Sequence, residues 1–139
     1  MYFTQHKLME EIVGHRIHQG LMALCDRPKD TPLEFLGDRI VVLDGVQDVQ
    51  NVGSIVRSAH AFGVDSMIVH ERGCSPFGRR SVRVSMGSVF SLKINHSEDI
   101  AGDLFDLKEL HGYQVIEAAK RPHAVLTTEA KFSEKSILI

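Results

Sequence analysis

Apolar residues recur along the chain in two patterns. Between residues 51 and 62 they fall three or four positions apart, which predicts a helix with one apolar face. Similar spacing predicts helices over residues 1–13 and 97–110, and a short helix is expected over 79–86. Short continuous runs of β-branched and aliphatic residues are typical of buried strands. They occur at 21–25, 39–44, 64–70, 88–94, 113–119 and 136–139.

The order of these segments predicts the fold class. From residue 39 onward strands and helices alternate, which indicates an α/β domain with a mostly parallel sheet and flanking helices. Ligands of such sheets bind at the carboxyl ends of the strands, here residues 43–50, 70–77 and 118–122. A loop over residues 27–32 contains two prolines and three charged residues, so we expect residues 1–32 to lead into a domain over 33–139.

Composition narrows the class of protein. The chain has 139 residues, of which 43% are hydrophobic and 24% charged, as expected for one globular domain. The N-terminal residues include charges and histidines at positions where a signal peptide would have an apolar stretch. No apolar run in the chain is long enough to span a membrane. We therefore expect a cytoplasmic protein without membrane association. Its two cysteines, Cys25 and Cys74, are expected to be free thiols.

The predicted helix over residues 51–62 carries candidate chemistry. Asn51 stands at its expected start, where it would cap the helix and offer its amide outward. Gly53 would let a substrate or another backbone approach closely, and Arg57, four residues later, lies on the same face. The guanidinium of an arginine at this position can bind a phosphate group through two hydrogen bonds. The same residues are also compatible with a simple cap, a packing glycine and a surface charge.

A second candidate is a group of cations in a chain whose formal net charge is −2. No acidic residue occurs between Arg72 and Glu98. This interval supports either an RNA-binding surface or a solvated face, and its arginines are Arg72, Arg79, Arg80 and Arg83. The histidine pair His15 and His18 lacks a third ligand nearby, so no metal site is predicted.

Residues 43–69, LDGVQDVQNVGSIVRSAHAFGVDSMIV, resemble motif 1 of the SpoU-type (TrmH-like) RNA 2′-O-ribose methyltransferases of the SPOUT superfamily. Residues 18–20 and 79–94 extend the resemblance, which covers nearly the whole chain from residue 14. Val49 stands where family members commonly have proline. The family's second and third motifs would follow residue 139. The resemblance thus implies the front part of a trefoil-knot domain, with the knot not completed in this chain.

The resemblance implies methyl transfer from S-adenosylmethionine to a ribose 2′-hydroxyl of RNA, with rRNA favoured over tRNA. Arg57 matches the arginine that activates and positions the hydroxyl, and Asn51 matches the asparagine that supports it. Glu117, Ala118 and Ala119 match a loop that borders the cofactor. By the same reasoning, the 139-residue chain alone would be inactive, with an incomplete cofactor pocket and no useful affinity for S-adenosylmethionine.

A homodimer is also expected, because family members build the site across two subunits. We expect Ile137, Leu138 and Ile139 to form an exposed, unfinished sheet edge that favours a partner.

Two other functions remain open at this point. One is an RNA-binding module of the same fold without catalysis. The more remote one is a phosphoacceptor receiver-like signalling domain, since Asp44 follows a predicted strand. A receiver needs an acidic pair after its first strand to bind Mg²⁺, whereas Asp26 stands alone after residues 21–25.

Overall fold

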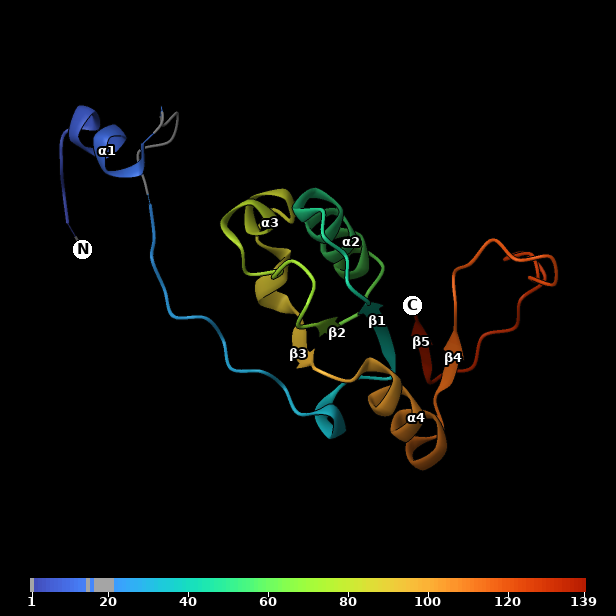
Figure 1. Cartoon of the computed structure of the whole chain (residues 1–139). Coiled ribbons are helices and arrows are strands. Elements are labelled where there is room, and N and C mark those ends of the chain that lie inside the picture. Colours follow the sequence, from blue (N-terminus) through green and yellow to red (C-terminus); the bar gives the residue numbers. More distant parts are fainter. Residues whose placement is uncertain (1, 15, 17–21) are drawn as a thin grey trace.

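The computed structural model describes residues 2–14, 16 and 22–139, and it places a parallel sheet at the centre of the molecule (Figure 1). The sheet order is β3-β2-β1-β5-β4, and every neighbouring pair is parallel. The strands are β1 (Arg39–Leu43), β2 (Ser66–His70), β3 (Lys93–Ser97), β4 (Gln114–Ile116) and β5 (Ser136–Leu138). The predicted α/β class with a parallel sheet is therefore confirmed.

Helices cover both faces of the sheet, as the continuous apolar strands predict. The helices are α1 (His6–Val13), α2 (Val49–Ala61), α3 (Arg79–Val84) and α4 (Ile100–His111), with 3₁₀ turns η1 (Leu33–Phe35) and η2 (Ser88–Ser91). In β1, Ile40 and Val42 pack with α4, whereas Leu43 packs with α2. Period-two alternation therefore divides the core into two layers. No helix in the described part of the chain has the length and apolar character that crossing a membrane requires.

The segment before the sheet differs from its predicted structure. Residues 22–25 form no strand, and Leu21 lies outside the described residues. Leu24 is 99% exposed, so the short apolar run buries too little surface to hold a strand in the sheet. Instead, the chain runs along β3, where the Thr31 amide donates to the Ile94 carbonyl (2.7 Å) and the Asn95 side chain donates to the Thr31 carbonyl (2.9 Å). α1 has no buried residues and lies apart from the sheet (Figure 1).

The prediction of a strand over residues 88–94 was wrong in position. Gly87 adopts a left-handed φ of 82° and starts the 3₁₀ turn η2, in which the Phe90 amide donates to the Gly87 carbonyl (3.1 Å). β3 begins only at Lys93, so His96 belongs to the strand. α4 likewise starts later than predicted because Asp99 caps it through the Gly102 amide (3.1 Å). β4 is shorter than the predicted 113–119.

The last strand also lies elsewhere than expected. β5 is an inner strand that pairs with β1 on one side and β4 on the other. Ile137 is fully buried against Ile40 and Val115, which it faces in register. Leu138 is 44% exposed. The predicted unfinished edge at residues 137–139 is therefore wrong, because β4 covers it.

Gly53 fixes the distance between α2 and α3. It is buried, and a Cβ at this position would lie 2.6 Å from Val84 Cβ and 2.8 Å from the Ser81 carbonyl oxygen. Both are parts of α3 that cannot rotate away. Of the two partners that the sequence allowed, a substrate or another backbone, the structure places the α3 backbone against this glycine.

We expect Gly53→Ala to destabilise the protein. Alanine gains about 1 kcal/mol over glycine in a helix interior, but overpacking against α3 costs about 1–3 kcal/mol. The net loss should appear as a lower urea midpoint. Ser58→Ala on the exposed side of α2 is the matched control and should leave the midpoint unchanged or slightly raised. A Gly53→Ala protein as stable as the control would contradict the close packing of α2 on α3.

Candidate functional site

The N-terminus of α2 stands at the carboxyl end of β1, where ligands of parallel sheets bind. Asp48, rather than Asn51, is the N-cap, since its carboxylate accepts from the Gln50 amide (2.7 Å). The prediction that Asn51 caps the helix is therefore wrong. Asn51 lies in the first turn and is exposed, so its amide is available to a ligand.

Arg57 lies on the exposed side of α2, away from the buried Val52, Val56 and Ala59. Its Nη1 lies 3.5 Å from Met86 Sδ, just beyond the end of α3. Met86 has a φ of 53°, which few residues with side chains adopt and which is common at functional sites. The guanidinium thus stands at the junction of α2 and α3 with little tying it to the core.

The structure brings most of the predicted RNA-binding arginines together. Arg79, Arg80 and Arg83 are exposed on α3 and, with Val84, line a pocket of about 560 Å³. Arg72 is exposed in the loop after β2 and does not line this pocket. Arg57 contacts Met86 just beyond the end of this short helix, so Arg57 and the α3 arginines belong to neighbouring elements.

The predicted cofactor-binding residues follow β4, at the opposite edge of the sheet from β3. The Ala118 amide donates to the Ile139 carbonyl (2.9 Å), and the Ala119 amide donates to the Glu117 carbonyl (3.1 Å). Glu117 also forms an exposed ion pair with Arg121 (2.7 Å). Because both alanine amides are used within the chain, their backbone contacts with a ligand would come from carbonyl oxygens.

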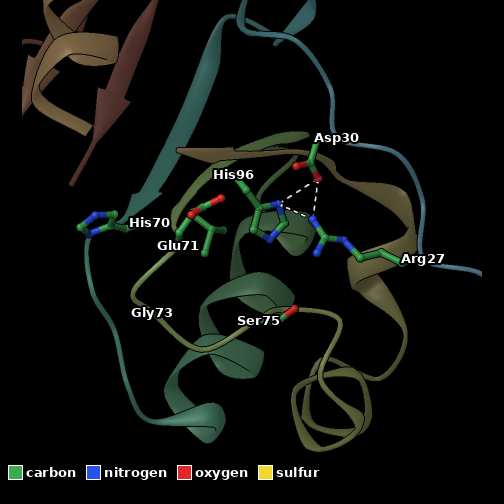
Figure 2. A pocket seen from close by; sticks show the side chains of 8 residues that line it. Arg27, Asp30, His70, Glu71, Gly73, Ser75 and His96 are labelled. Atoms are coloured by element: carbon green, nitrogen blue, oxygen red, sulfur yellow. Dashed lines mark hydrogen bonds and ion pairs between the residues drawn. The ribbon is translucent and has the colours of Figure 1, made fainter. Parts of the chain in front are cut away.

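A pocket that the sequence did not predict lies at the carboxyl ends of β2 and β3 (Figure 2). We call it the β2–β3 pocket. Its volume is about 250 Å³, and it is lined by Arg27, Asp30, Val69, His70, Glu71, Gly73, Ser75 and His96. The segment before the sheet therefore supplies Arg27 and Asp30, and the strands and the loop after β2 supply the rest.

Three side chains of this pocket form one network (Figure 2). Arg27 Nη2 donates to Asp30 Oδ1 (2.7 Å), and His96 Nδ1 lies 2.9 Å from the same oxygen. Because a carboxylate only accepts, Nδ1 carries the proton here and cannot also accept from Arg27 Nη2, which lies 2.9 Å away. His96 Nε2 is buried and has no hydrogen-bond partner among the described residues.

The charges of this network act on Asp30. Burial raises the pKa of its carboxyl, but the hydrogen bonds from Arg27 and His96, with the charges of these two groups, outweigh burial and lower the pKa overall. The carboxylate form is therefore favoured. Arg27 also lies over the Phe77 ring, 5.6 Å from its centroid, so its guanidinium is held from two directions.

Sequence reasoning missed the β2–β3 pocket for an identifiable reason. With the strand predicted over 88–94, His96 fell outside it, and no local pattern pairs His96 with a loop more than sixty residues earlier. The contact arises only when residues 22–32 pack along β3. A strand placed correctly at residues 93–97 would have set His96 beside Val69 at the ligand-binding end of the sheet.

The remaining histidines and cysteines considered in the sequence make local contacts where the structure describes them. His70 Nδ1 lies 3.0 Å from Asp44 Oδ1, and Cys74 donates to the Gln47 carbonyl (2.6 Å). Both cysteines are free thiols, as predicted. Among the described residues, no three His, Cys, Asp or Glu side chains gather to hold a metal ion, while His15 and His18 lie outside that part of the chain.

Comparisons with known proteins agree with this architecture. Residues 38–139 match the model of the SpoU rRNA methylase family. An uncharacterized tRNA/rRNA methyltransferase of Mycobacterium tuberculosis is 35% identical over 126 residues, which is 88% of this chain and 42% of that protein. A 23S rRNA (adenosine(1067)-2′-O)-methyltransferase of Streptomyces laurentii is 43% identical over 63 residues, 45% of this chain and 23% of that protein.

A solved structure shares nearly all of this fold. The AdoMet-bound rRNA methyltransferase from Sinorhizobium meliloti superposes with a TM-score of 0.75 and 25% sequence identity, over 96% of this chain and 52% of that chain. The chain thus spans less than half of the M. tuberculosis relative and about half of this structure.

Proposed function

Because this chain belongs to the SpoU rRNA methylase family, we propose that it serves the methylation of a ribose 2′-hydroxyl in RNA, with S-adenosylmethionine as methyl donor and rRNA favoured over tRNA. The named activities of the M. tuberculosis and S. laurentii relatives support an RNA substrate, and that of the S. laurentii enzyme supports the 2′-hydroxyl and rRNA. Family membership removes the basis for a receiver-like signalling domain.

One observation supports this proposal: exposed Arg57 contacts Met86 just beyond α3, the helix whose three exposed arginines line a pocket. A ribose hydroxyl is a weak nucleophile and must be positioned and electrostatically activated. Arg57 would do this by holding the adjacent phosphate and stabilising the negative charge that develops on the hydroxyl oxygen. An arginine stays protonated, so we assign it no role as a base.

The other predicted residues complete the proposed site. Asn51, exposed in the first turn of α2, would hold the substrate beside Arg57. Arg79, Arg80 and Arg83 would bind RNA phosphates, with Arg72 adding a contact from the loop after β2.

Glu117, Ala118 and Ala119 are suited to one wall of the cofactor pocket. They stand at the carboxyl end of β4, next to the end of β5, where a parallel sheet binds its ligands, and the two alanines leave room for an adenosyl group. They would hold S-adenosylmethionine through carbonyl oxygens and the Glu117 carboxylate, and the bound cofactor supplies an electrophilic methyl group. The S. meliloti relative, which was solved with AdoMet, supports this choice of cofactor.

A homodimer also belongs to this proposal, although one of its two supports is gone. The apolar edge expected at residues 137–139 does not exist, because β5 lies inside the sheet. The remaining support is the resemblance to a family that builds its site across two subunits.

Product analysis tests the proposed reaction. We expect the natural protein to transfer labelled methyl groups from S-adenosylmethionine to unmodified rRNA more efficiently than to tRNA. The labelled nucleotide should resist alkaline cleavage, because a methylated 2′-oxygen cannot attack the adjacent phosphate. Label that is released by alkali as ordinary mononucleotides would indicate base methylation. RNA binding without any transfer would favour the non-catalytic RNA-binding module.

A further inference from the structure

The β2–β3 pocket is not used by the proposed methyl transfer, yet it lies on the ligand-binding edge of the sheet. Its volume of about 250 Å³ is just below the roughly 300–1,000 Å³ of pockets for drug-sized ligands, so it suits a single planar ring system rather than a whole oligonucleotide. The lining offers both donors and acceptors, which is typical of sites that recognise the edge of a base.

The pocket lies next in the chain to residues proposed to bind phosphates. Glu71, in its lining, is followed at once by the exposed Arg72, and Ser75, on its far side, precedes Arg79 by four residues. RNA bound through a phosphate to Arg72 would therefore lie close to this pocket. Phosphate contacts position a nucleic acid, whereas contacts with bases provide the specificity.

The chemistry of the lining selects one base. Figure 2 shows the His96 ring between Arg27 and Glu71. A guanidinium pairs with the two acceptors O6 and N7 of guanine. A carboxylate only accepts, so it matches the two neighbouring donors of guanine, N1–H and the 2-amino group. No other base of RNA presents two adjacent acceptors on one edge and two adjacent donors on the next.

The arginine is also held in place before any ligand binds. Asp30 accepts from Arg27 at 2.7 Å, and the Phe77 ring lies under the guanidinium. Binding therefore costs less of the side-chain freedom that a mobile arginine would lose.

We propose that the β2–β3 pocket binds one unpaired guanine of the RNA substrate, whose two polar edges pair with Arg27 and Glu71. This inference rests on the RNA-binding part of the function proposed above. Arg27 and Asp30 precede residues 38–139, which match the family model, so the pocket joins six residues of the matched region to two residues outside it. It would give this protein a sequence preference that the phosphate-binding arginines alone cannot provide.

Fluorescence anisotropy with short labelled oligouridines tests the proposal. The central nucleotide is uridine, adenosine, guanosine or inosine. We expect the guanosine RNA to bind about tenfold more tightly than the uridine RNA, as for one good bidentate contact. Adenosine should resemble uridine, because it lacks the O6 acceptor and the N1–H donor. The inosine RNA should bind with an affinity between those of the uridine and guanosine RNAs, because inosine lacks only the 2-amino group that would pair with Glu71.

Variants separate the base contact from the phosphate contacts. Glu71→Gln and Arg27→Ala should each remove most of the preference for guanosine. Glu109→Gln, an exposed change on α4 at the other face of the sheet, is the matched control and should retain the full preference for guanosine. The double variant Arg79→Ala, Arg83→Ala should weaken binding of all four RNAs, with a shallower salt dependence and an unchanged ratio between them.

Equal binding of all four RNAs by the unaltered protein would overturn the guanine pocket and leave the proposed methyl transfer standing. A guanosine preference that survives both Glu71→Gln and Arg27→Ala would also overturn it, since the base would then bind elsewhere. Failure to bind any of the RNAs would overturn the pocket together with the RNA-binding function.

Discussion

Replacing Arg57 by alanine should reduce methyl transfer by about a hundredfold to a thousandfold, the range found when one charge-stabilising donor is removed from an active site. Arg57 is exposed on α2 and contacts the sulfur of Met86 at 3.5 Å. Loss of its side chain therefore removes charge from the α2–α3 junction but little packing. The measurement is transfer of labelled methyl groups to rRNA by the natural protein under single-turnover conditions.

Two comparisons make this result specific. The urea midpoint of Arg57→Ala should stay near that of the unaltered protein, because exposed substitutions usually change stability by less than about 0.5 kcal/mol. Arg57→Lys keeps the charge but loses the planar pair of donors, so its methyl-transfer rate should lie between that of the unaltered protein and that of Arg57→Ala. A normal rate in Arg57→Ala would exclude Arg57 from the mechanism.

Replacing Ile137 by alanine should cost about 2–5 kcal/mol of unfolding free energy, the range for cavities left in a close-packed core. Ile137 is fully buried between Ile40 of β1 and Val115 of β4. The cavity would open in the middle of the sheet, where neighbouring strands cannot collapse without breaking their register. Urea unfolding should show a lower midpoint with an unchanged slope, the sign of a change in stability alone.

Leu138→Ala is the matched control, since Leu138 follows directly in β5 but is 44% exposed. Leu138→Ala should lower the free energy of unfolding clearly less than Ile137→Ala does. Similar losses in the two variants would contradict the inner position of β5 and restore the exposed edge that the sequence predicted.

The types of most elements follow from local residue patterns. The apolar spacing from Val52 to Ala59 allows one compact arrangement, a helix with a buried face, and α2 forms there with Arg57 on the opposite side. The run at residues 39–43 is buried on both faces, which suits an inner strand of a parallel sheet. These predictions hold because the periods of helices and strands are set by the backbone itself.

Element boundaries depended on hydrogen bonds that the patterns do not reveal. Asp48 caps α2, so the helix begins at Val49, two residues before Asn51. Gly87 starts a 3₁₀ turn that occupies the first residues of the strand predicted over 88–94. In each case one side chain or one left-handed residue decides where the backbone changes direction. The apolar pattern is nearly the same on either side of the boundary.

The sequence by itself determined the α/β class, the parallel direction of the strands and the helix that carries Arg57, because these depend on local patterns of apolar residues and their succession along the chain. Only the tertiary structure decided that β5 lies inside the sheet, that Gly53 packs against α3, and that Arg27 and Asp30 meet His96. Each of these contacts joins segments far apart in the chain. Their geometry is set by which strands pair and in which register, and a single sequence carries no local signal of that pairing.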